Sequence, residues 1–216
     1  AQAFGAWRRA DSCIVRAGTA GDVGCYSFFP TKNLGGCGDG GMVVTCDAER
    51  AERLRRLRVH GEGRTYFHEE VGLNSRLDAL QAAVLDVKLP HLERWNADRR
   101  LCADRYRLLF ESRGLTDRVT LPEELSGNHH IYHQYVVRVP DRDRLMAHLD
   151  GLGLTTRVYY PLPLHLQPCF AFLGGRPGDY PQAERLSQEA LALPIFPGLE
   201  VEEQERLVEA ISVFLA

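Results

Sequence analysis

The stretch that decides the fold is Ser27-Phe28-Phe29-Pro30-Thr31-Lys32-Asn33-Leu34, which is followed by the glycine run Gly35-Gly36-Cys37-Gly38-Asp39-Gly40-Gly41. The apolar run over residues 25–29 is typical of a strand, and Pro30 ends it because proline cannot donate to a sheet ladder. Glycines adopt positive φ angles that other residues resist, and they let a phosphate or another backbone approach closely. The stretch therefore predicts a lysine presented on a turn at the end of a strand.

Composition draws attention to that lysine. The chain has 26 basic residues, but only Lys32 and Lys88 are lysines, and the other 24 are arginine. An amine can lose its proton and attack a carbonyl, and burial beside another cation brings its pKa from about 10.4 toward roughly 7 to 8, whereas arginine stays protonated. Lys32 is therefore a candidate nucleophile, although composition alone leaves open that it is one of two lysines without a special role.

Length, composition and charge exclude some classes of function. A chain of 216 residues with 44% apolar composition is long enough for one large domain or two small ones with a proper core. The net charge of -3 and the pI near 6.3 give no positive field for nucleic acid, and the basic cluster over residues 53–58 carries leucines at helical spacing. We expect a globular protein that binds no nucleic acid.

Other patterns concern membranes, thiols and metals. No apolar run approaches the roughly 20 residues that cross a bilayer and no signal peptide opens the chain, so we expect no membrane partner and a cytoplasmic protein. The six cysteines form no C-x-x-C pair, and three fall on apolar stretches, which favours buried free thiols over disulfides or zinc. The histidines lack carboxylates or thiols at ligand spacing, so no metal site is expected. Because the chain starts with Ala1 inside an apparent element, we expect a fragment or a processed piece.

The first half of the chain predicts strands followed by helices. Strands are expected over residues 13–17, 23–29 and 42–46, close enough together to form one sheet edge. Asp47 is expected to cap a helix over residues 48–59, and Asn74 or Ser75 is expected to cap the next helix. Pro90 cannot lie inside an unbroken helix, which predicts a kink near residue 89 and a second helix that stops at Gly114.

The second half alternates between strands and helices. Strands are expected over residues 132–139 and 155–160, and helices over residues 142–149, 182–191 and 201–214. Helices on one side of a small sheet would form an α+β lobe of roughly 100 residues. The long bent helix before Gly114 is expected to connect two domains.

Five blocks of the sequence, in order along essentially all 216 residues, match a known family. They are Ala1-Gln2-Ala3-Phe4-Gly5-Ala6, residues 26–34, residues 38–45, residues 72–78 with 81–83, and Tyr159-Tyr160-Pro161-Leu162-Pro163-Leu164-His165. Together they resemble the sugar aminotransferases of the DegT/DnrJ/EryC1/StrS family. The resemblance implies an α/β protein of fold type I, similar to aspartate aminotransferase. Residues 1–90 would be the C-terminal part of the large domain that binds pyridoxal phosphate, and residues 91–216 would be a small C-terminal α+β domain.

The same resemblance implies a cofactor, partners and site residues. The enzyme would use pyridoxal 5'-phosphate and act on nucleotide-linked keto sugars as a homodimer with shared active sites. Lys32 matches the Schiff-base lysine, Ser27 the serine that binds the phosphate, and Gln2 a residue near the phenolic oxygen of the cofactor. Asn74 matches the asparagine that reaches the phosphate in the neighbouring subunit's site, and His165 is a candidate for lining the sugar pocket. The carboxylate that pairs with the pyridine nitrogen should precede the first residue.

Each of these residues also has an alternative role that is purely structural. Ser27 could be a strand residue that faces solvent, and Gln2 an ordinary surface amide. Asn74 could serve as a helix cap, and His165 could simply fill space in a turn.

The predicted function is transfer of an amino group, with glutamate as the expected donor, to a nucleotide-linked keto(deoxy)sugar. A related alternative is dehydration, but the relatives that remove a sugar hydroxyl carry histidine at the lysine position, so Lys32 favours transamination. A second alternative is a catalytically silent interaction or regulatory protein that keeps the fold. The 216 residues alone are expected to be inactive, because the pyridine-binding carboxylate and the strands of the other cofactor wall are not among them.

Overall fold

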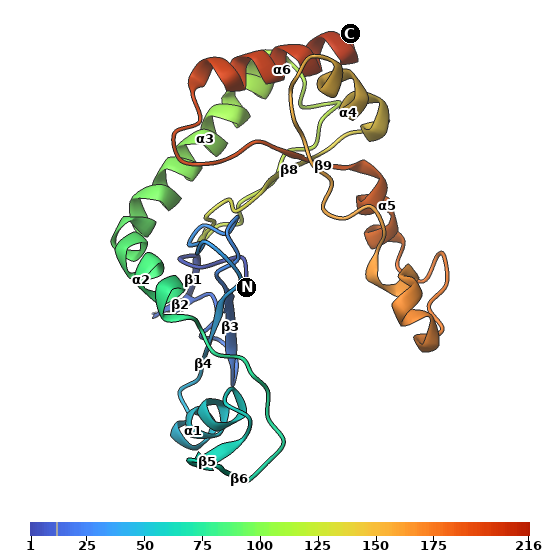
Figure 1. The fold of residues 1–216 in the computed structure, drawn as a ribbon. Coiled ribbons are helices and arrows are strands. Elements are labelled where there is room, and N and C mark those ends of the chain that lie inside the picture. Colours follow the sequence, from blue (N-terminus) through green and yellow to red (C-terminus); the bar gives the residue numbers. More distant parts are fainter. Residues whose placement is uncertain (12) are drawn as a thin grey trace. The chain divides into compact units, whose positions relative to one another are not determined.

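The computed structural model describes residues 1–11 and 13–216, and these form two compact units (Figure 1). The first unit comprises Ala1–Ala97 and Glu124–His133, and the second comprises Asp98–Glu123 and Gln134–Ala216. The units thus divide after residue 97, and residues 124–133 return to the first. The predicted domain boundary after residue 90 refers to the domains of the intact protein, and it stays a prediction.

The described strands of the first unit form three small antiparallel sheets. Strand β1 (Trp7–Ala10) pairs with β2 (Cys13–Arg16) and β7 (Asn128–His129), β3 (Gly24–Ser27) pairs with β4 (Gly41–Val44), and β5 (Glu62–Arg64) pairs with β6 (Phe67–His68). The prediction of one common sheet edge is wrong, because β2 and β3 belong to different sheets. Sheets of two or three strands leave their faces open. The expectation of buried thiols holds for Cys102 alone; the other five free cysteines are exposed, two of them, Cys13 and Cys25, on these open sheets.

Helix α1 (Ala48–Leu57) begins at the predicted cap. Oδ1 of Asp47 accepts a hydrogen bond from the N–H of Arg50 at 2.9 Å. This hydrogen bond lowers the pKa of Asp47 below its ordinary value of 3.8. Because the pKa in the folded state lies below that in the unfolded state, the charged cap stabilises α1 above about pH 4, and this contribution is lost as the pH falls through the folded-state pKa.

We therefore expect the amide protection factors of α1 to fall as the pH drops below about 4, beyond any change in the rest of the first unit. In Asp47→Asn an uncharged oxygen accepts the same hydrogen bond, so this pH-dependent component should disappear while the helix stays capped. Hydrogen exchange across the pH series measures the protection of α1 in both proteins. Identical pH profiles for the two proteins would contradict the assignment.

Helix α2 (Ala79–Lys88) begins later than predicted. Its cap is Asp78, whose Oδ1 accepts from the N–H of Leu80 at 3.0 Å, so the prediction of Asn74 or Ser75 as the cap is wrong. Asn74 instead forms an isolated antiparallel bridge with Val59, which keeps its backbone extended.

The predicted kink lies in the 3-10 turn η1 (Leu89–His91), which joins α2 to helix α3 (Leu92–Ser112). Pro90 lacks the N–H that a continuous helix needs, and this explains the interruption. Helix α3 ends just before Gly114, whose φ of +64° is the left-handed conformation that commonly ends helices. Both predictions about this helix are confirmed.

The second unit contains the remaining elements. They are β8 (Tyr135–Arg138), α4 (Arg142–Gly151), the 3-10 helices η2 (Leu164–Leu166) and η3 (Pro168–Leu173), α5 (Pro181–Glu189), β9 (Ala190–Leu193) and α6 (Val201–Leu215). All four residues of β9 are buried and pair with β8, so the helix predicted to reach residue 191 ends at Glu189. The strand predicted over residues 155–160 is wrong, since within that described segment pairing is limited to a bridge between Arg157 and Ala192.

A buried arginine explains why α5 gives way to β9. The side chain of Arg142 is 5% exposed, and its guanidinium donates to the carbonyl oxygens of Ala190 at 2.7 Å and Ser187 at 3.0 Å. Its Nε also donates to Asp143 at 2.6 Å. Basic side chains satisfy carbonyls left without partners at helix ends, so Arg142 fixes the end of α5.

Each unit has its own core. The first unit buries Phe28, Leu34, Leu85 and Leu92, with Phe4, Tyr26 and Leu77 packed against them. The second buries Tyr106, Phe110, Leu145, Leu149, Leu191, Leu207 and Ile211. Phe28 and Leu34 lie on either side of Lys32 in the sequence, so the lysine turn is anchored at both ends in the core.

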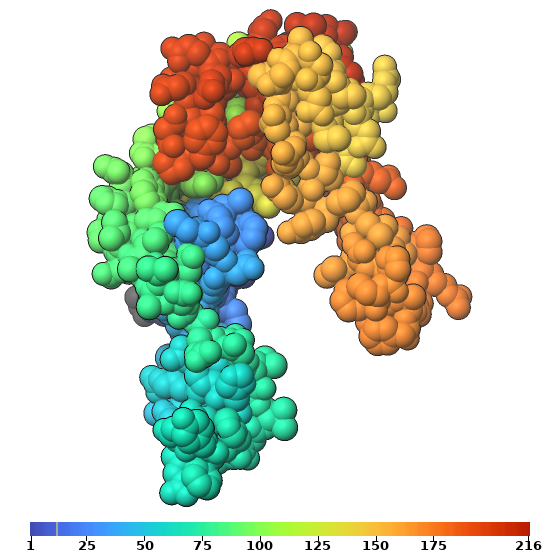
Figure 2. Space-filling model, in the orientation of Figure 1, coloured from blue at the N-terminus to red at the C-terminus, as the bar shows by residue number. Residues whose placement is uncertain are grey.

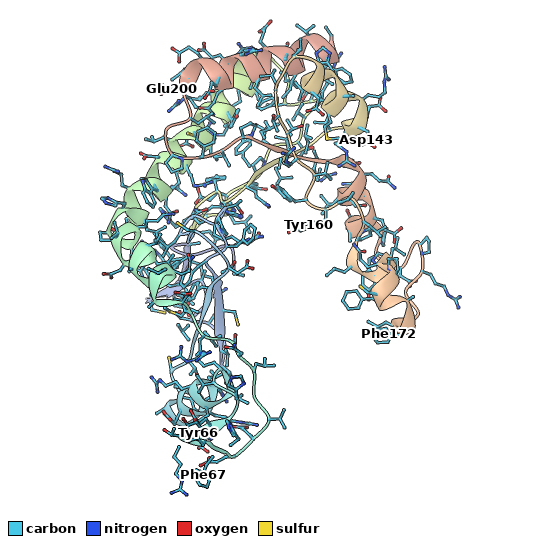
Figure 3. All side chains as sticks on the ribbon, in the orientation of Figure 1. Tyr66, Phe67, Asp143, Tyr160, Phe172 and Glu200 are labelled. Atoms are coloured by element: carbon cyan, nitrogen blue, oxygen red, sulfur yellow. The ribbon has the colours of Figure 1, made fainter. Side chains whose placement is uncertain are left out.

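Large apolar side chains remain exposed on both units. Tyr66 and Phe67 project from the β5–β6 hairpin with 87% and 57% exposure, and Phe172 on η3 is 80% exposed (Figure 3). The hairpin and α1, in blue-green, project from the rest of the first unit (Figure 2). Such side chains, when clustered, mark interaction surfaces.

Across residues 1–11 and 13–216, none of the helices has the length and apolar character required to span a membrane.

Candidate active site

The candidate site is built around the turn after β3. Ser27 is the last residue of β3 and pairs with Gly41 of β4. The N–H of Lys32 donates to the carbonyl oxygen of Phe29 at 2.9 Å, which closes a tight turn over Pro30. Lys32 is half-buried. The prediction of a lysine on a turn at a strand end is confirmed.

The glycine run lets the chain pack against itself. A Cβ atom on Gly35 would lie 2.4 Å from the carbonyl oxygen of Pro30, and one on Gly36 would lie 2.7 Å from Oε1 of Gln81. The same Oε1 accepts a hydrogen bond from the N–H of Cys37 at 2.7 Å. The sequence predicted that the glycines allow either a phosphate or another part of the protein to approach closely. In the structure, another part of the protein approaches them.

The first residues of the chain run beside the end of β3. The N–H of Ser27 donates to the carbonyl oxygen of Ala1 at 3.3 Å, and Oγ of Ser27 accepts from the N–H of Phe29 at 3.3 Å. Gln2 follows Ala1 and is exposed. The structure thus brings Gln2, Ser27 and Lys32 to the same end of the β3–β4 hairpin.

Asn74 lies elsewhere in the first unit. Its segment is bound to the end of α1 through hydrogen bonds such as that from the N–H of Leu73 to the oxygen of Leu57 at 2.7 Å. The side chain is exposed, and its Oδ1 accepts from Nε of Arg76 at 3.2 Å. These contacts place the segment of Asn74 against the end of α1 and not against the lysine turn.

His165 belongs to the second unit and is held by a carboxylate. Its side chain is 11% exposed, its Nε2 lies 3.0 Å from Oε1 of Glu184, and its ring centroid lies 4.8 Å from that of Tyr180. Burial raises the pKa of Glu184, but hydrogen bonds from the N–H of Gly178 and from His165 outweigh burial and lower the pKa below its ordinary 4.5. Glu184 is therefore anionic near neutral pH. His165 lines a cavity with Tyr159, Tyr160, Tyr180 and Leu186.

Sequence reasoning missed two supporting residues. Glu184 is one turn into α5, where a carboxylate favours the positive helix end, but its pairing with His165 spans 19 residues and has no local signal. Gln81 belonged to a matching block without an assigned role, and its contact with Cys37 spans 44 residues.

The donor set at the end of the β3–β4 hairpin fits pyridoxal phosphate in its chemistry. An amine suits the aldehyde of this cofactor, a hydroxyl suits the phosphate, and a carboxamide suits the phenolic oxygen. Lys32, Ser27 and Gln2 provide these three groups within the first unit, next to the anchored turn. The agreement with the cofactor therefore rests on the chemical groups present, an amine, a hydroxyl and a carboxamide, and on the segment that carries them.

Comparison with known proteins identifies relatives along nearly the whole chain. A model of the DegT/DnrJ/EryC1/StrS aminotransferase family matches residues 1–212. A protein of Geobacillus stearothermophilus named pleiotropic regulatory protein is 53% identical over 99% of this chain and 56% of its own length. A dTDP-3-amino-3,4,6-trideoxy-alpha-D-glucose transaminase of Streptomyces venezuelae is 43% identical over 98% of this chain and 54% of its own length.

Solved structures agree with the sequence comparison. The crystal structure of S. venezuelae DesV in complex with a ketimine intermediate matches with a TM-score of 0.90 and 42% identity, over 99% of this chain and 56% of that one. The predicted α/β aminotransferase fold is thus confirmed. The chain spans about half the length of the curated relatives it matches. With its ordered blocks, its lysine turn and its fold all in agreement, the chain belongs to the DegT/DnrJ/EryC1/StrS aminotransferase family.

Proposed function

We propose that the full-length protein is a pyridoxal-phosphate-dependent aminotransferase that moves an amino group, with glutamate as the expected donor, to a nucleotide-linked keto sugar. The observation that carries the proposal is Lys32 on its anchored turn after β3, the strand that ends at Ser27 beside the segment of Ala1 and Gln2, in a chain of this family. The name of the S. venezuelae relative, which is a transaminase of a dTDP-linked amino sugar, supports the substrate class.

Three residues would hold the cofactor. Lys32 Nζ would bond its aldehyde carbon, the Ser27 hydroxyl would donate to a phosphate oxygen, and the Gln2 carboxamide would face the phenolic oxygen. When bound, pyridoxal phosphate supplies an electron sink for the carbanion formed at an amino-bearing carbon. As a free neutral amine, Lys32 Nζ would accept the proton that leaves this carbon, which is work that a guanidinium cannot do.

The proposal includes a homodimer of fold type I with shared sites. Asn74 would contact the phosphate in the partner's site, because its segment lies away from the lysine turn of its own chain. Leu80 and Val87 of α2 are 76% and 72% exposed, and with Tyr66 and Phe67 they provide apolar surface for a second copy. Residues 91–216 would form the small domain, in which His165 would line the sugar pocket. The cytoplasm stays the predicted compartment.

Borohydride reduction of the full-length protein with pyridoxal phosphate tests the proposal. We expect a pyridoxyl adduct on Lys32 after peptide mapping, and we expect added glutamate to bleach the cofactor absorbance and yield 2-oxoglutarate. Lys88 is the internal control, since it is a lysine of the same unit without a proposed bond to the cofactor. An adduct on Lys88 but not on Lys32 would contradict the assignment of the reacting amine.

A second candidate, a catalytically silent regulatory protein, is favoured by the name of the Geobacillus relative at 53% identity. The same experiment separates the two candidates. A silent protein would give no adduct on Lys32 and no 2-oxoglutarate. An adduct without any keto acid from glutamate would instead favour dehydration or another amino donor.

A further inference from the structure

The residue that follows the candidate nucleophile is buried in a chain of polar contacts. Asn33 is 8% exposed, and its Nδ2 donates to Oδ1 of Asn96 at 2.7 Å and to the carbonyl oxygen of Ile131 at 3.3 Å. Its Oδ1 lies 3.1 Å from Nδ1 of His133. Asn96 in turn donates through Nδ2 to the carbonyl oxygen of Phe4 at 3.2 Å. The amide of Asn33 therefore ties the lysine turn directly to two other segments of the first unit, α3 and residues 131–133, and through Asn96 to a third, at Phe4.

Two backbone carbonyls fix the direction of every hydrogen bond in this series of polar contacts. A carbonyl oxygen only accepts, so the carbonyl of Ile131 must face the nitrogen of Asn33, and the carbonyl of Phe4 must face the nitrogen of Asn96. The oxygen of Asn33 then faces His133. Two acceptors cannot hydrogen-bond to each other, and Nδ1 of His133 therefore carries a proton.

The second lysine of the chain binds the same turn from another side. Nζ of Lys88 donates to the carbonyl oxygen of Gly35 and lies 6.0 Å from the ring centroid of Trp95. In a chain that uses arginine at 24 of 26 basic positions, the lysine at this part-buried contact is informative. A compact ammonium reaches a single carbonyl in a space where a planar guanidinium with five donors would leave several of them unsatisfied.

We propose that Asn33 and Lys88 are the positioning residues of Lys32. Backbone hydrogen bonds from Lys32 to Phe29 and from Gly36 to Phe28 close the turn, and the side chains of these two residues tie it to the rest of the first unit at residues 33 and 35. A reactive group must be held within a fraction of an ångström, and a displacement of about 1 Å costs roughly a hundredfold in rate. The inference rests on the proposed function only in taking Lys32 as the reacting amine.

Hydrogen exchange in full-length variants tests the proposal without using activity. Asn33→Asp replaces the donor by an acceptor that faces Asn96 and Ile131, and Lys88→Met removes the donor to Gly35 while keeping a chain of similar length. Each is expected to speed exchange over residues 32–37 by about tenfold or more, with α1 of the same unit unchanged. Asn128→Asp, which makes the same change at an exposed position of β7, is the matched control and should leave residues 32–37 unchanged.

Two further measurements keep the test decisive. In the unsubstituted protein, nitrogen-15 NMR of the imidazole should show a proton on Nδ1 of His133, and a neutral ring protonated only on Nε2 would overturn the bond directions. In both variants, formation of the pyridoxyl adduct on Lys32 should slow by about tenfold or more at equal cofactor concentration. Unchanged exchange over residues 32–37, or equal acceleration throughout the first unit, would overturn the positioning roles. Absence of an adduct in the unsubstituted protein would instead count against the proposed function, and the exchange result would stand by itself.

Discussion

Lys32→Arg is expected to lower the turnover of the full-length enzyme by about three orders of magnitude or more, because guanidinium can neither bond the aldehyde nor exist as a neutral base at neutral pH. The positive charge and the length of the side chain are retained. The turn should also persist, since its anchors Phe28 and Leu34 are each 3% exposed and unchanged. Steady-state turnover and the cofactor absorbance measure the effect, with thermal unfolding as the test of folding.

Lys88→Arg is the matched comparison, because it makes the same exchange at the only other lysine of the chain. This substitution alters the contact that positions Lys32 but leaves the reacting amine itself unchanged. The pyridoxyl adduct on Lys32 should therefore still form, but more slowly. If Lys32→Arg kept the turnover of the unsubstituted enzyme, Lys32 could not be the nucleophile and the proposed mechanism would be wrong.

Mixing two inactive variants is expected to restore activity. Asn74→Asp places a negative charge where the proposal puts a phosphate of the partner's site, and about a hundredfold loss is expected in that variant alone. In a mixed dimer of Lys32→Arg and Asn74→Asp, one site receives both defects and the other receives none. Random exchange of subunits should therefore return about a quarter of the activity of the unsubstituted enzyme.

A second pair of variants serves as the control for this experiment. Ser27 ends β3 just before the turn of Lys32 in the same chain, so a mixture of Lys32→Arg and Ser27→Ala contains no intact site in any dimer and should be no more active than the two variants measured separately. Activity that never returns in the first mixture, despite proven exchange of subunits, would place Asn74 in the site of its own chain or outside the site altogether.

The lysine turn could be predicted because its determinants are local. An apolar run, a proline and a series of small residues follow one another within residues 25–41, and each restricts the backbone by itself. The cap of α1 and the break at Pro90 were predictable for the same reason. In these cases the residue type and its immediate neighbours decide the conformation.

The errors arose where distant residues decide between local options. Asn74, Ser75 and Asp78 all favour helix starts, and the bridge between Asn74 and Val59 excludes the earlier ones. The run of residues 190–193 suits a helix or a buried strand, and pairing with β8 selects the strand. Asn33 contacts residues 63 and 100 positions away, so no pattern near residue 33 could reveal its bonds.

The convergence of both lysines on one turn has a practical consequence for anyone who handles this protein. Within these 216 residues, amine-directed acylating reagents and cross-linkers would find lysine side chains only at this turn. Coupling through these lysines, which is routinely treated as random, would here modify the turn that carries the candidate nucleophile.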